Sequence, residues 1–230
     1  EAVNTQLPAN PAGGNDCPSG DGANDTIVLP AGTFPSTLES GVQIFRNVQI
    51  LGAGMGKTTV TGMGIYVFEV ASWPDNGFPS TIAVTMKDLT IRRDPTEALP
   101  VNGVLVESTC CSGGQHQSLT MQRVKITDVD FEGIRVADSS GVLDINDSIL
   151  DGIHGNGLVI KGALRMDRTA VTNNQETGIY FNGVGNSRIF NSTIAGNTTA
   201  DKGGGIWSQV ADTGTFEIFN STIARNPVSY

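Results

Sequence analysis

The sequence contains little charge, few aromatic residues and few cysteines. Of its 230 residues, 16% are charged and 6% are aromatic, and no Lys or Arg precedes Arg46. With a formal net charge of −9 and no cluster of cations, the chain is not expected to bind DNA or RNA. An anionic polysaccharide would also be repelled at long range, although a local cationic groove could overcome this repulsion. No apolar run approaches the roughly 20 residues that cross a membrane, so no membrane span is expected.

The three cysteines do not form a metal-binding pattern. Cys17, Cys110 and Cys111 are an odd number, and the adjacent pair lacks the C-x-x-C spacing of zinc sites. A disulfide from Cys17 to Cys110 or Cys111 and three free thiols both agree with this pattern. We therefore expect no metal or cofactor at the cysteines.

Proline is absent from most of the chain, and a repeated strand pattern occupies that stretch. Nine prolines lie at or before Pro100 and the tenth is Pro227, which favours stacked strands between them. An apolar-x-apolar-x-x-small-x-apolar pattern starts at Val84, Leu119, Leu143, Leu164, Ser187 and Phe216, with a weaker match at Phe45, Val48 and Ile50. A second pattern, Gly-apolar-x-apolar, starts at Gly64, Gly103, Gly133, Gly157, Gly178 and Gly205.

These repeats predict an all-β fold, a parallel β-helix of about seven coils in one continuous domain. Repeats of 21 to 35 residues with alternating short strands are typical of solenoids whose coils stack about 4.8 Å apart. Residues 1–40 are acidic and rich in turn formers, so we expect them to cap the N-terminal end. The solenoid is expected to cover residues 41–230.

Two columns of residues support this register. The fifth pattern position reads Asp88, Arg123, Asp147, Arg168, Asn191, Asn220, which places opposite charges on neighbouring coils. The eleventh reads Asn174, Asn197, Asn226, which predicts an asparagine ladder at a corner where Asn adopts a left-handed backbone. The Asn-x-Ser/Thr sequences at Asn191, Asn197 and Asn220 are therefore interpreted as structural.

A resemblance to a known family adds to this picture. The segments Glu1–Val3, Asn10–Pro11 and Asp25–Phe34 are similar to the N-terminal signature of bacterial secreted proteins that begin Cys-Ser-Leu-Arg-Glu-Ala and continue into a right-handed parallel β-helix. The segments 191–197 and 220–226 resemble the repeat unit of those proteins and, more loosely, of the pectin-lyase-like superfamily. The resemblance implies a right-handed β-helix that is secreted or displayed on a bacterial surface as a structural or adhesive module.

One acidic corner is a candidate catalytic site. Asp128, Asp130, Asp147 and Asp151 are expected to gather there with His154, as the carboxylates and base of a polysaccharide lyase, epimerase or glycosidase would. Calcium held by the same carboxylates is an alternative. Asp147 also has predicted partners in Arg123 and Arg168, and Asp, Asn and Gly are common at turns, so a structural role is favoured over catalysis. The glycines around Gly54 and Gly56 precede β-branched residues, which argues against a phosphate-binding loop.

A column on the second strand is a candidate binding surface. It is predicted to read Tyr66, Leu105, Arg135, Val159, Tyr180, Trp207. Neighbouring Tyr180 and Trp207, with Arg135 as a hydrogen-bond donor, suit a sugar or a protein partner.

The C-terminal strand pattern has no evident cap. An open edge of this kind favours self-association through the coil ends, as in a filament, or contact with another surface protein. The leading hypothesis is therefore an extracellular structural or adhesive module. The alternatives are a carbohydrate-active enzyme and a glycan-binding module.

Overall fold

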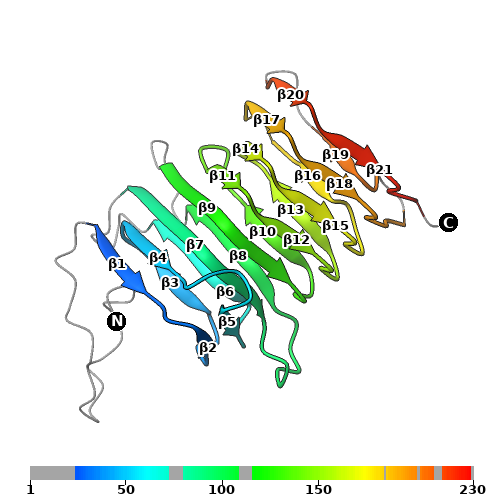
Figure 1. The fold of residues 1–230 in the computed structure, drawn as a ribbon. Helices are drawn as coiled ribbons and strands as arrows, with labels where there is room; N and C mark the ends of the chain where they lie inside the picture. Colours follow the sequence, from blue (N-terminus) through cyan, green and yellow to red (C-terminus); the bar gives the residue numbers. More distant parts are fainter. Residues whose placement is uncertain are drawn as a thin grey trace, which may run out of the picture.

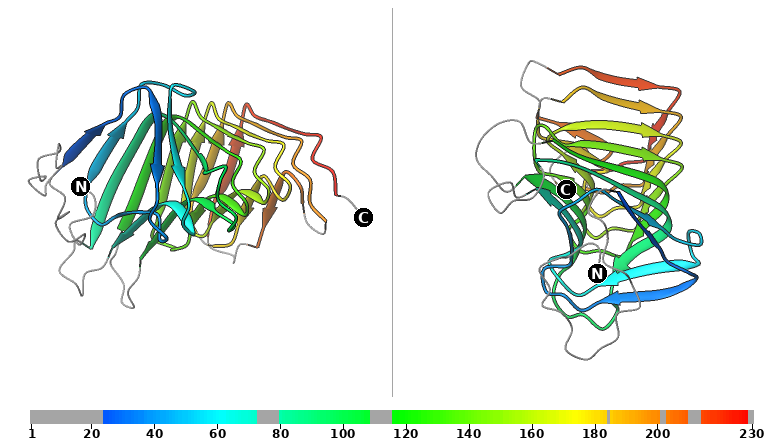
Figure 2. Two further views of the ribbon diagram at one scale, coloured as in Figure 1. Left: turned by 90° about the horizontal axis from the view of Figure 1, so that it is seen from below. Right: turned by 90° about the vertical axis from the view of Figure 1, so that its left-hand side faces the viewer.

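The protein is an all-β, right-handed parallel β-helix, as predicted. The computed structural model describes residues 24–72, 80–108, 116–183, 185–200, 203–209 and 214–228, and it contains parallel strand pairs throughout these ranges. Figure 1 shows the coils following one another along a single axis, and Figure 2 shows their strands side by side. No helix in the described ranges is long and apolar enough to cross a membrane.

Each complete coil contributes a segment to each of three faces. Face 1 comprises β1 (Asp25–Val28), β4 (Val48–Leu51), the first part of β7 (Thr81–Arg93), the first part of β9 (His116–Thr127), β11 (Val142–Asn146), β14 (Ala163–Asp167), β17 (Ser187–Phe190) and β20 (Phe216–Phe219). Face 2 comprises β2 (Gly32–Ser36), β5 (Thr58–Gly62), the remainders of β7 and β9, β12 (Ile149–Asp151), β15 (Ala170–Thr172), β18 (Thr193–Ala195) and β21 (Thr222–Ala224). Face 3 comprises β3 (Val42–Ile44), β6 (Tyr66–Ser72), β8 (Asn102–Ser108), β10 (Glu132–Val136), β13 (Asn156–Ile160), β16 (Ile179–Phe181) and β19 (Ile206–Ser208).

The coils, numbered 1 to 8 from β1, comprise seven complete turns and the first two strands of an eighth. Faces 1 and 2 form one 14-stranded sheet because β7 and β9 continue from one face to the other, whereas face 3 is a separate seven-stranded sheet. The predicted register of the first strand pattern is confirmed: Leu143 lies beside Leu119 and Leu164. Alternate residues point inward and form one continuous apolar core, in which Met86, Met121 and Ile145 are buried.

The predicted charge column turns the corner between faces 1 and 2. Its six residues, Asp88, Arg123, Asp147, Arg168, Asn191 and Asn220, have φ between 47° and 59°. Arg123 donates to both carboxylate oxygens of Asp88, at 2.6 and 2.7 Å, and Arg168 donates likewise to Asp147, at 2.6 and 3.0 Å. An arginine rarely adopts this left-handed backbone, so the bidentate pairs offset some of its strain.

The asparagine ladder is confirmed, but its backbone conformation was predicted wrongly. Asn174 and Asn197 are buried, and Asn174 donates from its backbone and side-chain nitrogens to Oδ1 of Asn197, at 3.1 and 2.8 Å. The left-handed residues are those one position earlier, including Asn173 with φ 54° and Gly196 with φ 71°. The preceding residue makes the turn, which leaves the ladder asparagine pointing inward.

The solenoid begins before residue 41, where the sequence pattern placed its start. β1 and β2 lie within the expected cap, 1–40, and pair in parallel with β4 and β5 of coil 2. Residues 1–23, with Cys17, lie outside the described residues, as do Cys110 and Cys111. The disulfide therefore stays a prediction. At the opposite end, four apolar side chains of coil 8 are exposed: Phe216, Ile218, Phe219 and Ile223.

Candidate functional site

The outward residues of face 3 form two columns, and the predicted column mixed them. Strand pairing gives the first column as Gln43, Glu69, Leu105, Arg135, Val159, Tyr180, Trp207. Tyr66 is therefore wrongly placed in the prediction, because it pairs with Asn102 instead of Leu105. The cause is Gly64, which sits in a tight turn against the backbone of Glu39 and does not occupy the strand position of Gly103.

The second column is polar. Tyr66 lies beside Asn102, and Glu132 lies beside Asn156. The backbone nitrogen of Glu132 donates to Oδ1 of Asn102 at 3.0 Å, and the Asn102 side chain donates to the Ile65 carbonyl at 3.1 Å. These bonds hold the amide of Asn102 in one orientation and link the strand starts of neighbouring coils.

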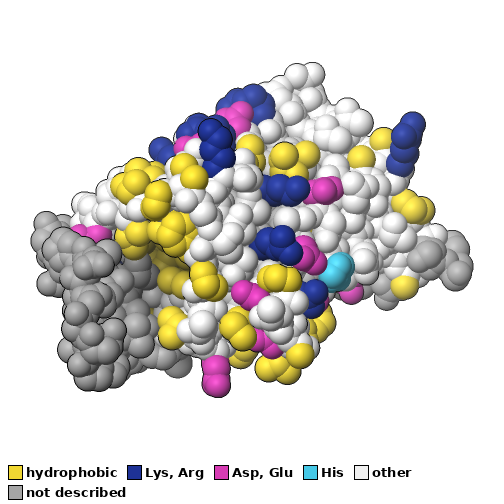
Figure 3. Space-filling view, turned by 60° about the horizontal axis from the view of Figure 1, so that its bottom comes forward, with side chains coloured by type: hydrophobic (Ala, Val, Ile, Leu, Met, Phe, Trp, Pro, Cys, Tyr) yellow, Lys and Arg dark blue, Asp and Glu magenta, His cyan; other side chains and the backbone are white. Residues whose placement is uncertain are grey.

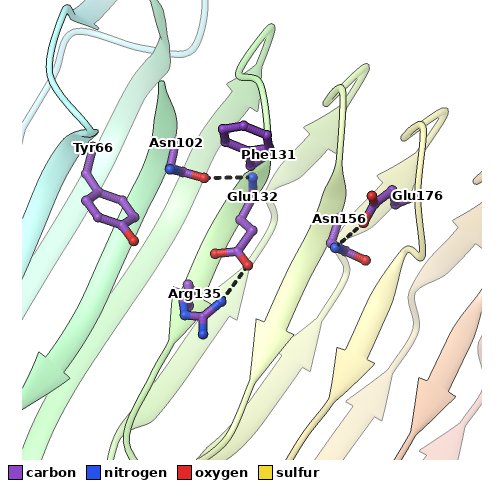
Figure 4. Close-up of a pocket in the computed structure, with 7 residues that line it drawn as sticks. All are labelled: Tyr66, Asn102, Phe131, Glu132, Arg135, Asn156 and Glu176. Atoms are coloured by element: carbon purple, nitrogen blue, oxygen red, sulfur yellow. Dashed lines mark hydrogen bonds and ion pairs between the residues drawn. The ribbon is translucent and has the colours of Figure 1, made fainter. Parts of the chain in front are cut away.

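This polar column lines a pocket of about 340 Å³. Its walls are Tyr66, Asn102, Phe131, Glu132, Arg135, Asn156 and Glu176. The Asn156 side chain donates to Glu176, and the ring of Phe131 is 55% exposed at the rim. Figure 4 shows the Tyr66 hydroxyl directed toward the side of the pocket that carries Glu132 and Arg135. The pocket thus combines an aromatic rim with amide, carboxylate, guanidinium and phenol groups.

Burial and charge shape the ionisation of this pocket. Nη1 of Arg135 lies 2.6 Å from Oε1 of Glu132, whose side chain is only 16% exposed. Burial raises the pKa of Glu132, Arg135 opposes this shift, and the charge of Glu176 adds to it. Burial also raises the pKa of Tyr66, and the negative charge of Glu132 contributes. The Tyr66 hydroxyl is therefore protonated and able to donate at neutral pH.

Two further carboxylates lie on the same face. Glu69 is buried and accepts a hydrogen bond from Nε2 of Gln43 at 2.9 Å. Glu107 lies on β8, two residues beyond Leu105, the residue that pairs with Glu69. Burial raises the pKa of Glu107, and the charge of Glu69 raises it further. Face 3 therefore carries more carboxylates than its outward arginine can balance.

The aromatic pair lies on the same face, nearer the C-terminus. The rings of Tyr180 and Trp207 stack with centroids 4.3 Å apart and planes inclined by 21°, which confirms that they are neighbours. The Tyr180 hydroxyl donates to Oε1 of Gln209 at 2.8 Å. Arg135 is on coil 4 and Trp207 on coil 7, so about 14 Å separates them at the usual strand spacing.

The predicted acidic corner is not assembled as one site. Asp147 turns the corner between faces 1 and 2, where it pairs with Arg168. Asp151 is the last residue of β12 on face 2 and lies beside Thr127, and Asp128 follows Thr127 at the turn toward face 3. There Asp128 contacts Nη2 of Arg92 at 3.0 Å, and Oδ1 of Asp151 accepts from Thr172 and Asn173, each at 2.8 Å.

His154 contacts Asp130, one of the carboxylates expected at this corner. Its Nδ1 lies 3.4 Å from Oδ1 of Asp130, which also pairs with Arg93. Cationic and acidic side chains likewise lie next to one another on the face seen in Figure 3. Among the described residues, no three His, Cys, Asp or Glu side chains gather in a way that could hold a metal ion. This corner resembles a set of structural ion pairs.

Sequence reasoning identified Arg135, Tyr180 and Trp207 but missed the pocket beside them. The missed residues are Asn102, Phe131, Glu132, Asn156 and Glu176. A signal was present, because Glu132 and Asn156 immediately precede Gly133 and Gly157, the glycines that recur in the second strand pattern. Polar residues recurring at one repeat position mark an outward column.

Comparison with known proteins identifies the architecture. A family model described as "Right handed beta helix region" matches residues 132–229, and no curated protein matches the chain. The solved structure of the mannuronan C-5 epimerase AlgE6 A-module of Azotobacter vinelandii has 13% identity and a TM-score of 0.39, covering 86% of this chain and 90% of that one. ORF18 of Geobacillus virus E2 has 16% identity and a TM-score of 0.44, and the match covers 77% of this chain and 35% of that one. An alginate lyase of Paenibacillus sp. has 12% identity and a TM-score of 0.41, and the match covers 86% of this chain and 92% of that one.

The resemblance to bacterial secreted proteins stays a prediction. Residues 132–229 match the family model by sequence, and the described residues of the same stretch form parallel coils.

Proposed function

We propose that the chain is a glycan-binding β-helix module whose binding surface is the outer side of face 3. The observation that carries the proposal is the placement of the polar pocket and the Tyr180–Trp207 pair on one sheet face. Sugars are bound through apolar contact with aromatic rings together with a few oriented hydrogen-bonding groups. Face 3 offers both kinds of contact along the solenoid axis.

The pocket supplies the directional contacts. The carboxylates of Glu132 and Glu176 accept hydrogen bonds from sugar hydroxyls, and Asn156 and the Tyr66 hydroxyl donate them. The exposed ring of Phe131 provides an apolar surface at the rim. A ligand that reaches from this rim to Trp207 spans coils 4 to 7, so a chain of several sugars fits better than a monosaccharide.

Calorimetric titration of the chain with neutral oligosaccharides tests the proposal. Trp207→Ala and Asn156→Ala are expected to weaken binding about tenfold or more. Phe219→Ala is the matched control, since it removes an exposed aromatic ring that stacks on Phe190 on face 1 instead. Equal binding by all three variants and the wild type would remove face 3 as the binding surface.

A structural role is a second candidate, favoured by coil 8. Its exposed Phe216, Ile218 and Ile223 continue three inward columns of the core, and they line a groove of about 520 Å³ with Ile206. An apolar edge of this kind is a template for another coil. Light scattering after gel filtration tests it: a concentration-dependent oligomer that Ile223→Asp abolishes would support assembly through this edge, and a monomer at all concentrations would refute it.

We also propose that the protein is secreted or displayed on a bacterial surface. Catalysis at the Asp151–His154 corner is not part of the proposal, because the carboxylates there already bond to neighbouring side chains. Turnover of a polysaccharide that Asp151→Ala abolishes, with the fold intact, would overturn this view.

A further inference from the structure

Face 3 is poor in available positive charge around the pocket. Its outward side chains include four carboxylates, those of Glu69, Glu107, Glu132 and Glu176, against the cations of Arg135 and Lys161. Lys161 follows β13 at the edge of the face, two coils from Glu107 along the same column, and it is exposed. Arg135 is therefore the cation that lines the pocket itself.

The positive charge of Arg135 is already offset by a carboxylate. The guanidinium contacts Glu132 at 2.6 Å, and the Glu132 side chain is largely buried. If a ligand carboxylate drew Arg135 away, Glu132 would remain as a buried charge without its partner, which is strongly unfavourable. The charge of Glu176 adds to that cost, since it already disfavours ionised Glu132.

A second negatively charged region, formed by Glu69 and Glu107, lies on the same face. Glu107 makes no hydrogen bond or ion pair with another described residue, and it lies near the buried Glu69. A uronate chain that followed the coils would bring its carboxylates toward both groups. Neutral sugar hydroxyls, in contrast, donate to carboxylates and form charge-assisted hydrogen bonds.

We infer that the face 3 site takes glycan chains that lack carboxylates and rejects polyuronates. This inference rests on the proposed glycan-binding function and names its substrate class. The discrimination comes from the pairing of Arg135 with Glu132 together with the carboxylates around them. The aromatic contacts at Phe131, Tyr180 and Trp207 contribute affinity without regard to charge.

The test compares two panels of hexasaccharides by calorimetry at low ionic strength. The neutral panel contains cello-, xylo- and mannohexaose, and the acidic panel contains the hexamers of galacturonate, mannuronate and guluronate. At least one neutral ligand is expected to bind, with every uronate at least tenfold weaker, which corresponds to about 1.4 kcal/mol. Glu107→Gln with Glu176→Gln is expected to narrow this gap, as is added salt for the wild type. Glu217→Gln on face 1 is the control and leaves the gap unchanged.

The outcomes separate the inference from the function on which it rests. A uronate that binds as tightly as the best neutral ligand, with binding lost in Trp207→Ala, overturns the inference while the glycan-binding site stands. An unchanged gap in the Glu107→Gln, Glu176→Gln double variant overturns the electrostatic explanation. If no hexasaccharide of either panel binds, the proposed function fails and the inference falls with it.

Discussion

Replacing Asn197 with alanine is the sharpest perturbation of the stacked coils. The Asn197 side chain is fully buried and joins three coils. Its Oδ1 accepts from the backbone and side-chain nitrogens of Asn174, and its Nδ2 donates to the Val171 carbonyl at 3.0 Å and to Oδ1 of Asn226 at 2.9 Å. Alanine removes all four hydrogen bonds, of which three are buried and the one to Asn226 is partly buried.

The expected loss follows from those groups. A buried donor or acceptor that loses its partner costs about 1–3 kcal/mol, and relaxation or an entering water recovers part of the sum. We therefore expect Asn197→Ala to lower the free energy of unfolding by about 4 kcal/mol. Urea denaturation followed by circular dichroism measures this change, and hydrogen exchange of the backbone amides locates it in coils 6 to 8.

The matched control is Asn191→Gly on the same coil. Asn191 also joins coils, accepting from Asn220 at 2.6 Å and donating to Asp167 at 2.8 Å, but these bonds are exposed to solvent. Glycine tolerates its φ of 47°, so the expected loss is below about 1 kcal/mol. Equal losses in the two variants, or a loss below about 1 kcal/mol for Asn197→Ala, would refute the reasoning.

Three further predictions concern other parts of the solenoid. Hydrogen bonds from Arg123 and Arg168 lower the pKa values of Asp88 and Asp147, so these groups contribute stability that is present above the pKa of unfolded Asp and lost as the pH falls through the folded value. Acid titration of the unfolding free energy below about pH 4 is expected to be less steep in Arg123→Ala and Arg168→Ala, and an unchanged slope would argue against the pairs. Burial and Glu69 raise the pKa of Glu107, so its contribution to stability is fully present below the unfolded pKa and is lost as the pH rises through the folded value. Glu107→Gln is therefore expected to stabilise the fold at pH 7 relative to pH 4, and a uniform effect at both would contradict this. Gly157→Ala places a Cβ 2.5 Å from the Gly178 carbonyl oxygen and is expected to cost about 3 kcal/mol in thermal or urea unfolding, whereas a wild-type midpoint would show that the coils can separate there.

The coil stacking was predictable because inward and corner positions obey a strict repeat. Inward residues must be apolar, so Leu119, Leu143 and Leu164 recur at matching positions and define the register. Corner residues lie beside their counterparts in the next coil, so the opposite charges of Asp88 and Arg123 predict that the two side chains pair. Coil 1 was not predicted from the sequence. Asp25 occupies the position that Val48 fills in coil 2, and this charged residue interrupts the apolar pattern.

The candidate site was less predictable because it depends on turns instead of strands. Phe131 and Glu176 lie in turns, where no alternation indicates which side chains point outward. Tyr66 was assigned to the wrong column because a glycine within a turn, Gly64, resembles the strand glycines of later coils in sequence. The pairing of Glu132 with Arg135 joins positions three apart in the chain, a separation that strand periodicity does not single out.

A crystal structure of the chain with a bound neutral hexasaccharide tests the central claim most directly. The account predicts density for the sugar along the outer side of face 3, in contact with the Phe131 rim, the Glu132–Arg135 pair and the Trp207 ring. Density on face 1 or face 2, or at the Asp151–His154 corner with face 3 empty, would contradict it.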